Sequence, residues 1–132
     1  MTFRYSLMTH KREELIDILS YVEESIQKSN IDDGIVVLFV PHTTAAVTIN
    51  ENADPSVRED IIQFLSEKIP RSRNYSHLEG NADSHIKSSL ISPSLSLILE
   101  NGKLILGTWQ TVYFYEFDGP RNRTFFVKII SS

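Results

Sequence analysis

The stretch Leu95-Ser-Leu-Ile-Leu-Glu-Asn-Gly-Lys-Leu-Ile-Leu106 decides the fold of the second half of this chain. Two apolar runs, Leu95–Leu99 and Lys103–Leu106, flank the dipeptide Asn101-Gly102. Asn-Gly between two apolar runs is the strongest short-range signal of a β-hairpin, because both residues tolerate the positive φ of a tight turn. The stretch therefore predicts two antiparallel strands.

The residues that follow the hairpin predict two more strands. Thr108–Phe117 is a long aromatic run, and Phe125–Ile130 is a second apolar run. Asp118-Gly119-Pro120 lies between them and has the composition of a turn. Four late strands joined by short connections indicate an antiparallel sheet.

The first half of the chain alternates between strand and helix signals. Residues 2–8 alternate apolar and polar side chains, as a half-buried strand does. Thr9 can cap a helix whose apolar residues recur at helical spacing, namely Leu15, Ile18, Leu19, Val22 and Ile26. Ile35–Val40 is apolar on both phases, which predicts a strand covered on both faces. Val47–Ile49 is a further short strand.

Two more helices are expected before the hairpin. Asp54-Pro55 is a strong helix start, because the aspartate can cap and proline suits the first helical position. This helix extends to about Ile69, before Pro70. Asn81 or Asp83 can cap a short helix that runs to Leu90. The resulting order along the chain is β-α-β-β-α-α-β-β-β-β, which is a single α+β domain over residues 1–132 with antiparallel or mixed sheet layers and helices packed on one side.

Composition limits the possible classes of protein. The chain has 132 residues, of which 41% are hydrophobic and 23% charged, as in ordinary soluble domains. The formal net charge of −4 argues against nucleic acid as the main partner. No apolar run is long enough to span a membrane, and the N-terminus lacks the pattern of a signal peptide, so a cytoplasmic location is expected. Because there is no cysteine, any metal must be bound by nitrogen and oxygen ligands.

The stretch His77-Leu-Glu-Gly-Asn-Ala-Asp-Ser-His85 is the richest in groups that can carry chemistry. His77 and His85 could meet His42, which follows a predicted strand, around one metal ion or one anionic substrate. Glu79 and Asp83 could bind the metal, orient an imidazole or act as a general base. The alternative is structural: one histidine packs or caps, another is exposed, and none binds a metal.

Other polar residues have weaker signals. Thr43 and Thr44 place hydroxyl and N–H groups at a sheet edge, where an anion could bind. Gln110, Glu116 and Asp118 share one face of the aromatic strand, which suggests a pocket wall or a subunit contact. Two arginines after the Gly-Pro turn could bind phosphate, namely Arg121 and Arg123.

Four motifs in the same order closely resemble the YjbQ family. They are His42-Thr-Thr-Ala-Ala-Val-Thr-Ile-Asn-Glu-Asn-Ala-Asp-Pro55, His77-Leu-Glu-Gly-Asn-Ala-Asp-Ser-His-Ile-Lys87, Glu100-Asn-Gly-Lys-Leu-Ile-Leu-Gly-Thr-Trp-Gln110 and Glu116-Phe-Asp-Gly-Pro-Arg121. The resemblance extends over essentially the whole chain. It implies a small α+β subunit that forms a homotrimer, with the histidine motifs gathered in a polar site.

The resemblance also implies an activity and a set of site residues. Members are known as secondary thiamine-phosphate synthases, which join a pyrimidine diphosphate to a thiazole phosphate and release pyrophosphate. The metal ligands would be His42, His77 and His85, and the catalytic residues Glu79, Asp83 and Glu116. The phosphorylated substrate would be bound by Thr43, Thr44, Asn81, Gln110 and Arg121.

Histidine ligands favour zinc over magnesium, which prefers oxygen ligands. A zinc-dependent hydrolase of a phosphorylated small molecule is therefore an alternative to the transferase. A non-catalytic, metabolite-binding trimer is the third possibility. No nucleic acid or membrane partner is expected.

Overall fold

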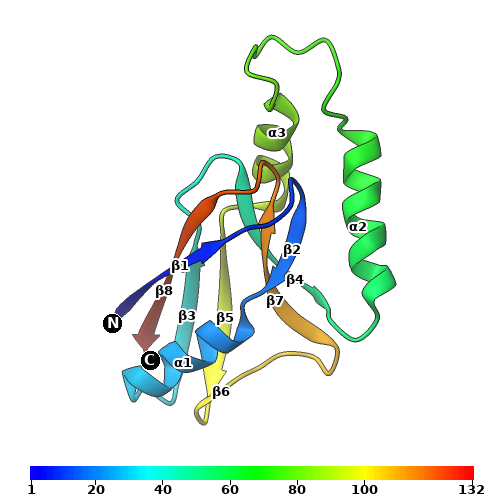
Figure 1. The fold of residues 1–132 in the computed structure, drawn as a ribbon. Helices are drawn as coiled ribbons and strands as arrows, with labels where there is room; N and C mark the ends of the chain where they lie inside the picture. The colour runs from blue at the N-terminus through cyan, green and yellow to red at the C-terminus, as the bar shows by residue number, and fades with distance from the viewer.

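Two antiparallel β-sheets form the body of the molecule, as the computed structural model of residues 1–132 shows (Figure 1). The larger sheet has the strand order β1-β8-β3-β5-β6, and the smaller has the order β2-β7-β4. The strands of the larger sheet are β1 (Thr2–Met8), β8 (Asn122–Ser131), β3 (Gly34–Phe39), β5 (Ser94–Glu100) and β6 (Lys103–Leu104). Those of the smaller sheet are β2 (Glu14–Asp17), β7 (Gln110–Glu116) and β4 (Ala45–Glu51).

The predicted hairpin is present, although its second strand is short. Asn101 and Gly102 have φ values of 51° and 76°, as a tight two-residue turn requires. β6 pairs with β5 only through Lys103 and Leu104. One more backbone hydrogen bond, from Ile105 N to Ile98 O at 2.9 Å, joins the chain to β5 before it leaves the sheet.

The main core lies between the two sheets. β3 contributes Val36 and Leu38, and β7 contributes Val112 and Phe114, all without exposed surface. The outward side chains of β3 are exposed to solvent: Ile35 is 49% exposed and Phe39 is 46% exposed. The prediction that this strand is covered on both faces is therefore wrong: no helix packs on the outer face of the larger sheet.

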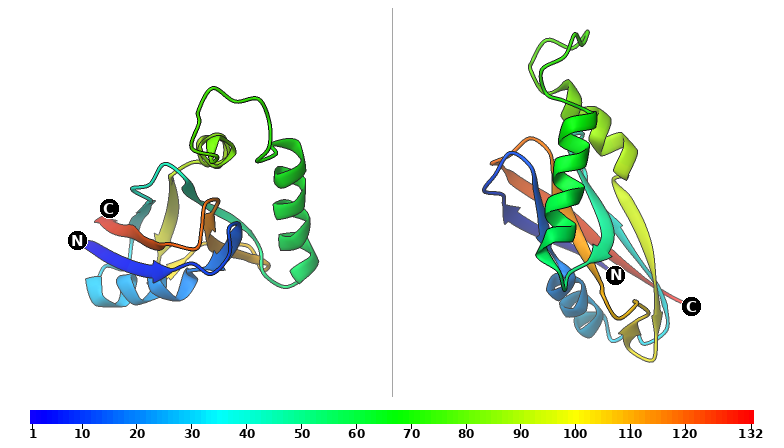
Figure 2. Two further views of the ribbon diagram at one scale, coloured as in Figure 1. Left: turned by 45° about the horizontal axis from the view of Figure 1, so that its top comes forward. Right: turned by 90° about the vertical axis from the view of Figure 1, so that its right-hand side faces the viewer.

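The three helices cover one end of the core and the outer face of the smaller sheet (Figure 2). α1 (Leu19–Ser29) contributes Val22 and Ile26 to the main core. α2 (Pro55–Lys68) and α3 (Ala82–Ile91) pack against a second cluster on the smaller sheet. That cluster consists of Leu15, Ala46, Tyr113, Tyr115 and Phe117. The α+β class with helices on one side is confirmed, and no helix is both long and apolar enough to cross a membrane.

The predicted order of elements is also confirmed, with one additional short strand. Glu14–Asp17 forms β2 on the edge of the smaller sheet, so α1 begins at Leu19 rather than after Thr9. The hydroxyl of Thr9 does not cap a helix, because it donates to Glu116 at 2.8 Å. Thr9 therefore contacts a residue that is distant in sequence and does not form the predicted local cap. Asp54 does cap α2, through a hydrogen bond from Ser56 N at 3.0 Å.

One glycine allows two strands of the larger sheet to approach. A Cβ at Gly34 would overlap the carbonyl oxygen of Ile130 on β8. Gly34→Ala should therefore lower the free energy of unfolding by about 1–3 kcal/mol through overpacking, measured by chemical denaturation. Gly107→Ala is the control, because the nearest atom is the movable end of the Gln110 side chain at 3.2 Å. Equal denaturation midpoints for the two variants would contradict this explanation.

Candidate functional site

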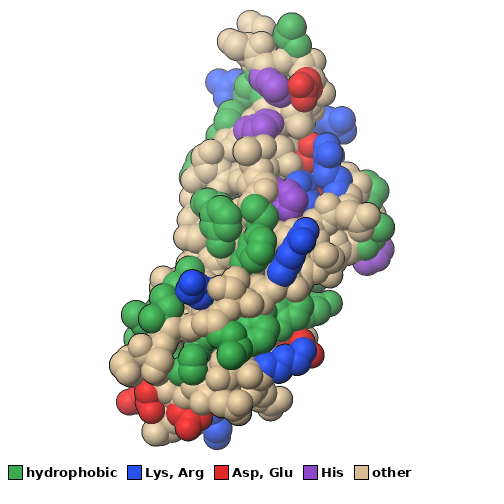
Figure 3. Space-filling view, turned by 90° about the vertical axis from the view of Figure 1, so that its left-hand side faces the viewer, with side chains coloured by type: hydrophobic (Ala, Val, Ile, Leu, Met, Phe, Trp, Pro, Cys, Tyr) green, Lys and Arg blue, Asp and Glu red, His purple; other side chains and the backbone are tan.

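Connections that are distant in sequence meet at one end of the sheets, beside the start of α3 (Figure 1). The β7–β8 turn reaches the β1–β2 connection, where Gly119 N donates to Arg12 O at 3.0 Å. It also reaches the β3–β4 connection, where Phe117 N donates to Thr44 O at 3.2 Å. We call the exposed and half-buried polar groups at this end the polar rim, which comprises His42, Thr43, His77, Glu79, Asn81, His85, Asp118 and Arg121. Figure 3 shows histidine side chains at this upper end of the molecule.

A chain of hydrogen bonds connects four residues of the polar rim. Asn81 Nδ2 donates to Asp118 Oδ2 at 2.9 Å, and its Oδ1 lies 3.0 Å from His77 Nε2. Since the amide oxygen only accepts, His77 must carry a proton on Nε2. Arg121 closes the chain with bonds to the carbonyl and carboxylate oxygens of Asp118 at 2.8 and 2.9 Å.

The two histidines of the predicted stretch are in contact. The His77 and His85 ring centroids are 5.2 Å apart in an edge-to-face arrangement. Glu79 Oε2 lies 3.7 Å from His77 Nε2, and the Glu79 side chain is 77% exposed. These contacts bring the exposed carboxylate of Glu79 close to the imidazole pair of His77 and His85.

His42 is held in one tautomer by the neighbouring strand. Its Nε2 accepts a hydrogen bond from Thr124 N at 3.0 Å, so in the neutral ring the proton is on Nδ1. Burial lowers the pKa of His42, and the positive charge of Arg123 lowers it further. His42 is therefore a neutral ring with a fixed N–H donor at neutral pH.

The predicted zinc site is wrong. No three His, Cys, Asp or Glu side chains lie close enough together to hold a metal ion. Nε2 of His42 accepts from Thr124, and Nε2 of His77 is bonded to Asn81. The cations Arg121 and Arg123 also act on His42, where a third ligand was expected.

Glu116, predicted to be catalytic, is the centre of a buried network. Neither Glu116 nor its partner Arg123 is more than 5% exposed, and the carboxylate accepts from both Nε and a terminal nitrogen of this guanidinium. It also accepts from the Thr9 hydroxyl at 2.8 Å and from two backbone N–H groups, each at 3.1 Å. Thr44 Oγ1 accepts from Arg123 at 2.8 Å. This geometry gives Glu116 and Thr44 a structural role.

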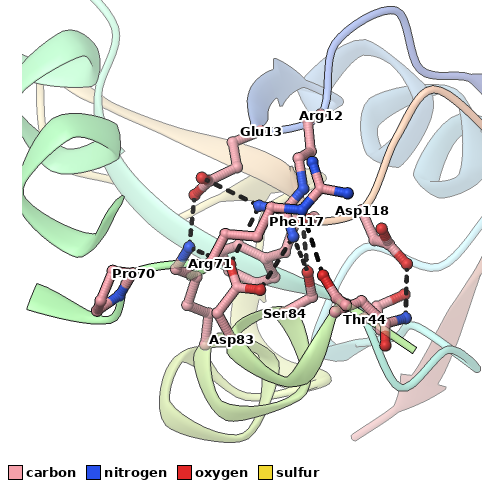
Figure 4. A network of polar contacts seen from close by, with 12 residues as sticks. Arg12, Glu13, Thr44, Pro70, Arg71, Asp83, Ser84, Phe117 and Asp118 are labelled. Atoms are coloured by element: carbon pink, nitrogen blue, oxygen red, sulfur yellow. Dashed lines mark hydrogen bonds and ion pairs between the residues drawn. The ribbon is translucent and has the colours of Figure 1, made fainter. Parts of the chain in front are cut away.

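Asp83, the other buried carboxylate among the predicted catalytic residues, is held by two cations, of which Figure 4 labels Arg12. Arg12 bonds to both of its oxygens, at 2.9 and 3.1 Å, and Lys87 Nζ bonds at 2.8 Å. Burial alone would raise the pKa of Asp83, but the hydrogen bonds and charges of Arg12 and Lys87 outweigh it, so the pKa is lowered. Lys87 also lies 3.2 Å from Glu13, which ties α3 to the β1–β2 connection.

Of the residues predicted to bind substrate, Thr43 lies in the polar rim and Gln110 does not. Thr43 is exposed beside His42, whereas Gln110 lies at the opposite end of β7 from Glu116. Six residues of extended strand span roughly 20 Å, so Gln110 is remote from the polar rim of the same chain. Its Oε1 accepts from Gly107 N at 2.7 Å, which is a local turn contact.

Arg12 and Lys87 are the main site residues that were not predicted. Lys87 is four residues after Asp83 on a helix, a spacing that favours an ion pair and could have identified it. Arg12 is separated from Asp83 by 71 positions, and no local pattern connects them.

A double-sheet α+β protein with a polar site on the loops at one end is the class that this fold and this site define. The chain matches the family model described as "UPF0047 protein YjbQ-like" over residues 3–132. It therefore belongs to the UPF0047 family, as the resemblance of its motifs indicated.

Relatives of known sequence and structure agree with this assignment. The UPF0047 protein MJ1081 of Methanocaldococcus jannaschii is 59% identical over 130 residues, which are 98% of this chain and 94% of the relative. A crystal structure of a YjbQ/UPF0047 protein from Clostridium acetobutylicum is 52% identical, with a TM-score of 0.96 over 97% of this chain and 99% of that chain. A YbjQ-like protein of unknown function from Sulfolobus solfataricus is 33% identical, with a TM-score of 0.96 over 100% of this chain and 97% of that one.

These relatives correct the expected function. Their descriptions give a family without an assigned activity, and one of them is described as being of unknown function. Together with the lack of a cluster of metal ligands, this overturns the prediction of a metal-dependent thiamine-phosphate synthase. The zinc-dependent hydrolase fails for the same reason, and the relatives give no support to the non-catalytic, metabolite-binding trimer.

The buried pair of Glu116 and Arg123 makes a prediction about stability. Glu116→Gln should lower the free energy of unfolding by about 3–5 kcal/mol, because it leaves a buried guanidinium without its counter-charge. Chemical denaturation measures the effect, and Glu79→Gln is the matched control because Glu79 is exposed. If both variants unfold at the wild-type midpoint, the buried pair does not have this structural role.

Proposed function

We propose that the polar rim binds a phosphorylated small molecule and exchanges protons with it through His77 and His85. The observation that carries this proposal is the hydrogen-bonded chain from His77 through Asn81 and Asp118 to Arg121. It fixes an imidazole and a guanidinium at the same exposed end of the molecule. We also propose a cytoplasmic location, because the charge of phosphorylated metabolites retains them inside cells.

Arg121 provides the main attraction for an anion. Its side chain is 53% exposed, and it uses one N–H of Nε and one of a terminal nitrogen to bond Asp118. A guanidinium has five N–H groups, so the others remain free for phosphate oxygens. The contacts to Asp118 hold the planar group in place before a ligand arrives. His42 adds a neutral N–H donor whose direction is set by Thr124.

The histidine pair is suited to proton transfer. Imidazole changes protonation near neutral pH more readily than other side chains. Asn81 orients His77 through Nε2, which leaves Nδ1 and the adjacent His85 ring for a substrate. Glu79, 3.7 Å from His77, adds an exposed carboxylate beside this ring. One residue could then give a proton while the other accepts one, which is general acid–base catalysis.

Binding and catalysis can be tested separately. Arg121→Met should weaken the binding of glycerol 3-phosphate and inorganic phosphate about tenfold or more, because a charge-assisted contact is lost. Binding is followed by NMR titration of the backbone amides. The control Arg4→Met removes an exposed arginine on β1 and should leave binding unchanged. Equal affinities for wild type and Arg121→Met would refute the proposed anion site.

The catalytic role is tested with a panel of phosphorylated metabolites followed by ³¹P NMR. His77→Ala should lower the rate of any reaction found by about 10²–10⁴-fold while phosphate still binds. His10→Ala, an exposed histidine on the β1–β2 connection, is the control. An unchanged rate in His77→Ala would refute the acid–base role and leave the anion site intact.

We further propose that copies of the chain associate through the outer face of the larger sheet, in the homotrimer that the family resemblance implies. This face exposes Ile35, Ile98 and Ile130 by 49%, 60% and 46%. Apolar patches that no element covers are typical of subunit interfaces. Hydrophobic side chains lie in patches over the side of the molecule in Figure 3.

Sedimentation analysis tests the assembly. Ile98→Glu should convert the trimer to monomers, because it would bury a charge at the centre of the interface. Leu78→Glu is the control, since Leu78 is 92% exposed and lies on the segment before α3, away from the sheet face. A monomeric wild-type protein, or a trimer that survives Ile98→Glu, would rule out this interface.

A further inference from the structure

We infer that a hollow between α1 and the β5–β6 hairpin binds a small zwitterion with an apolar side group, which is the chemistry of a free apolar amino acid. The hollow has a volume of about 390 Å³, within the range of small-molecule sites. It lies at the opposite end of the molecule from α3 and the polar rim (Figure 1). This inference therefore does not depend on the proposed function of the rim.

The hollow exists because the hairpin leaves the sheet early. β6 has only two residues, and after the contact between Ile105 and Ile98 the chain no longer follows β5. The departing segment leaves space against α1. The walls of this space expose apolar atoms from both elements, and its hydrophobic residues are Leu19, Ile26, Leu104 and Leu106.

These apolar residues belong to the edge of the main core. Ile26 is 6% exposed and part of the core cluster, and Leu19, Leu104 and Leu106 pack against it. Their remaining surface is held in place by the core behind it. An apolar side group of a ligand would cover this surface and exclude water from it.

Two opposite charges lie over this apolar surface without partners. Glu23 on α1 and Lys103 on β6 both line the hollow, and neither forms an ion pair or a side-chain hydrogen bond. The next glutamate on the same helix, Glu24, is paired with Lys28 at 3.3 Å.

The arrangement of charges selects the class of ligand. An ammonium group would donate to the Glu23 carboxylate, and a carboxylate would accept from the Lys103 ammonium. Gln27, one turn after Glu23, adds an amide to the same wall. A ligand with only one charge would leave either Glu23 or Lys103 without a partner, so a zwitterion fits best.

The experiment is an NMR titration of the whole protein with L-leucine, L-isoleucine, L-methionine and L-phenylalanine. At least one of them should shift the methyl signals of Leu104 and Leu106 and leave the imidazole signals of the polar rim unchanged. The amide of the amino acid that binds, which lacks the carboxylate, and its deaminated acid (4-methylpentanoate for leucine), which lacks the ammonium group, should bind about tenfold more weakly than that amino acid. If none of the four amino acids shifts these methyl signals, or if the two truncated compounds bind as well as the intact amino acid, the inference is overturned.

Substitutions on the two walls locate the site. Glu23→Gln and Lys103→Met should each weaken binding of the selected amino acid about tenfold or more. Glu24→Gln and Lys28→Met are matched controls on the same helix and should leave it unchanged. All four positions are exposed, so folding is retained, as the amide spectrum would verify. Equal affinities in all four variants would also overturn the inference.

Discussion

The buried contact between Glu116 and Arg123 is the constraint on which the arrangement of this end of the molecule depends. It joins the end of β7 in one sheet to the start of β8 in the other, and Thr9 and Thr44 add the two remaining connections. A buried carboxylate is costly unless its oxygens are saturated with donors, so these segments must take up one fixed geometry. This network therefore also fixes the positions of the rim residues on the same segments, above all Arg121.

A second buried network positions α3. Unlike an ordinary surface helix, α3 buries polar side chains and exposes apolar ones. Its buried side chains include Asp83, Ser84, Lys87 and Ser88, while Ile86 and Leu90 are 40% and 65% exposed. The polar side chains are satisfied by Arg12 and by the carbonyl oxygens of Phe117 and Ala45. The helix is therefore placed by directional bonds more than by apolar packing, which fixes its rotation and the position of the His85 ring beside His77.

The sequence predicted what depends on local pattern and missed what depends on distant contacts. The Asn101-Gly102 hairpin and the Asp54 cap of α2 were found because their signals lie within a few residues. The start of α1 was misplaced because Thr9 bonds to Glu116, 107 positions away. In the site, the contact of His77 with His85 was anticipated from their shared stretch. The metal site was not realised because Asn81 and Thr124 take up ring nitrogens, and spacing does not reveal such partners.

His42 also acts as part of the larger sheet. β3 ends at Phe39, which pairs with Phe126, and Pro41 then interrupts the strand. Thr124, the next outward residue of β8, would have no backbone acceptor on that side, and the imidazole nitrogen of His42 supplies one at 3.0 Å. A side chain thus serves as one more rung of the ladder, and this rung requires an unprotonated Nε2. Protonation of Nε2 would remove this single hydrogen bond at the end of β3 and place a positive charge in the polar rim.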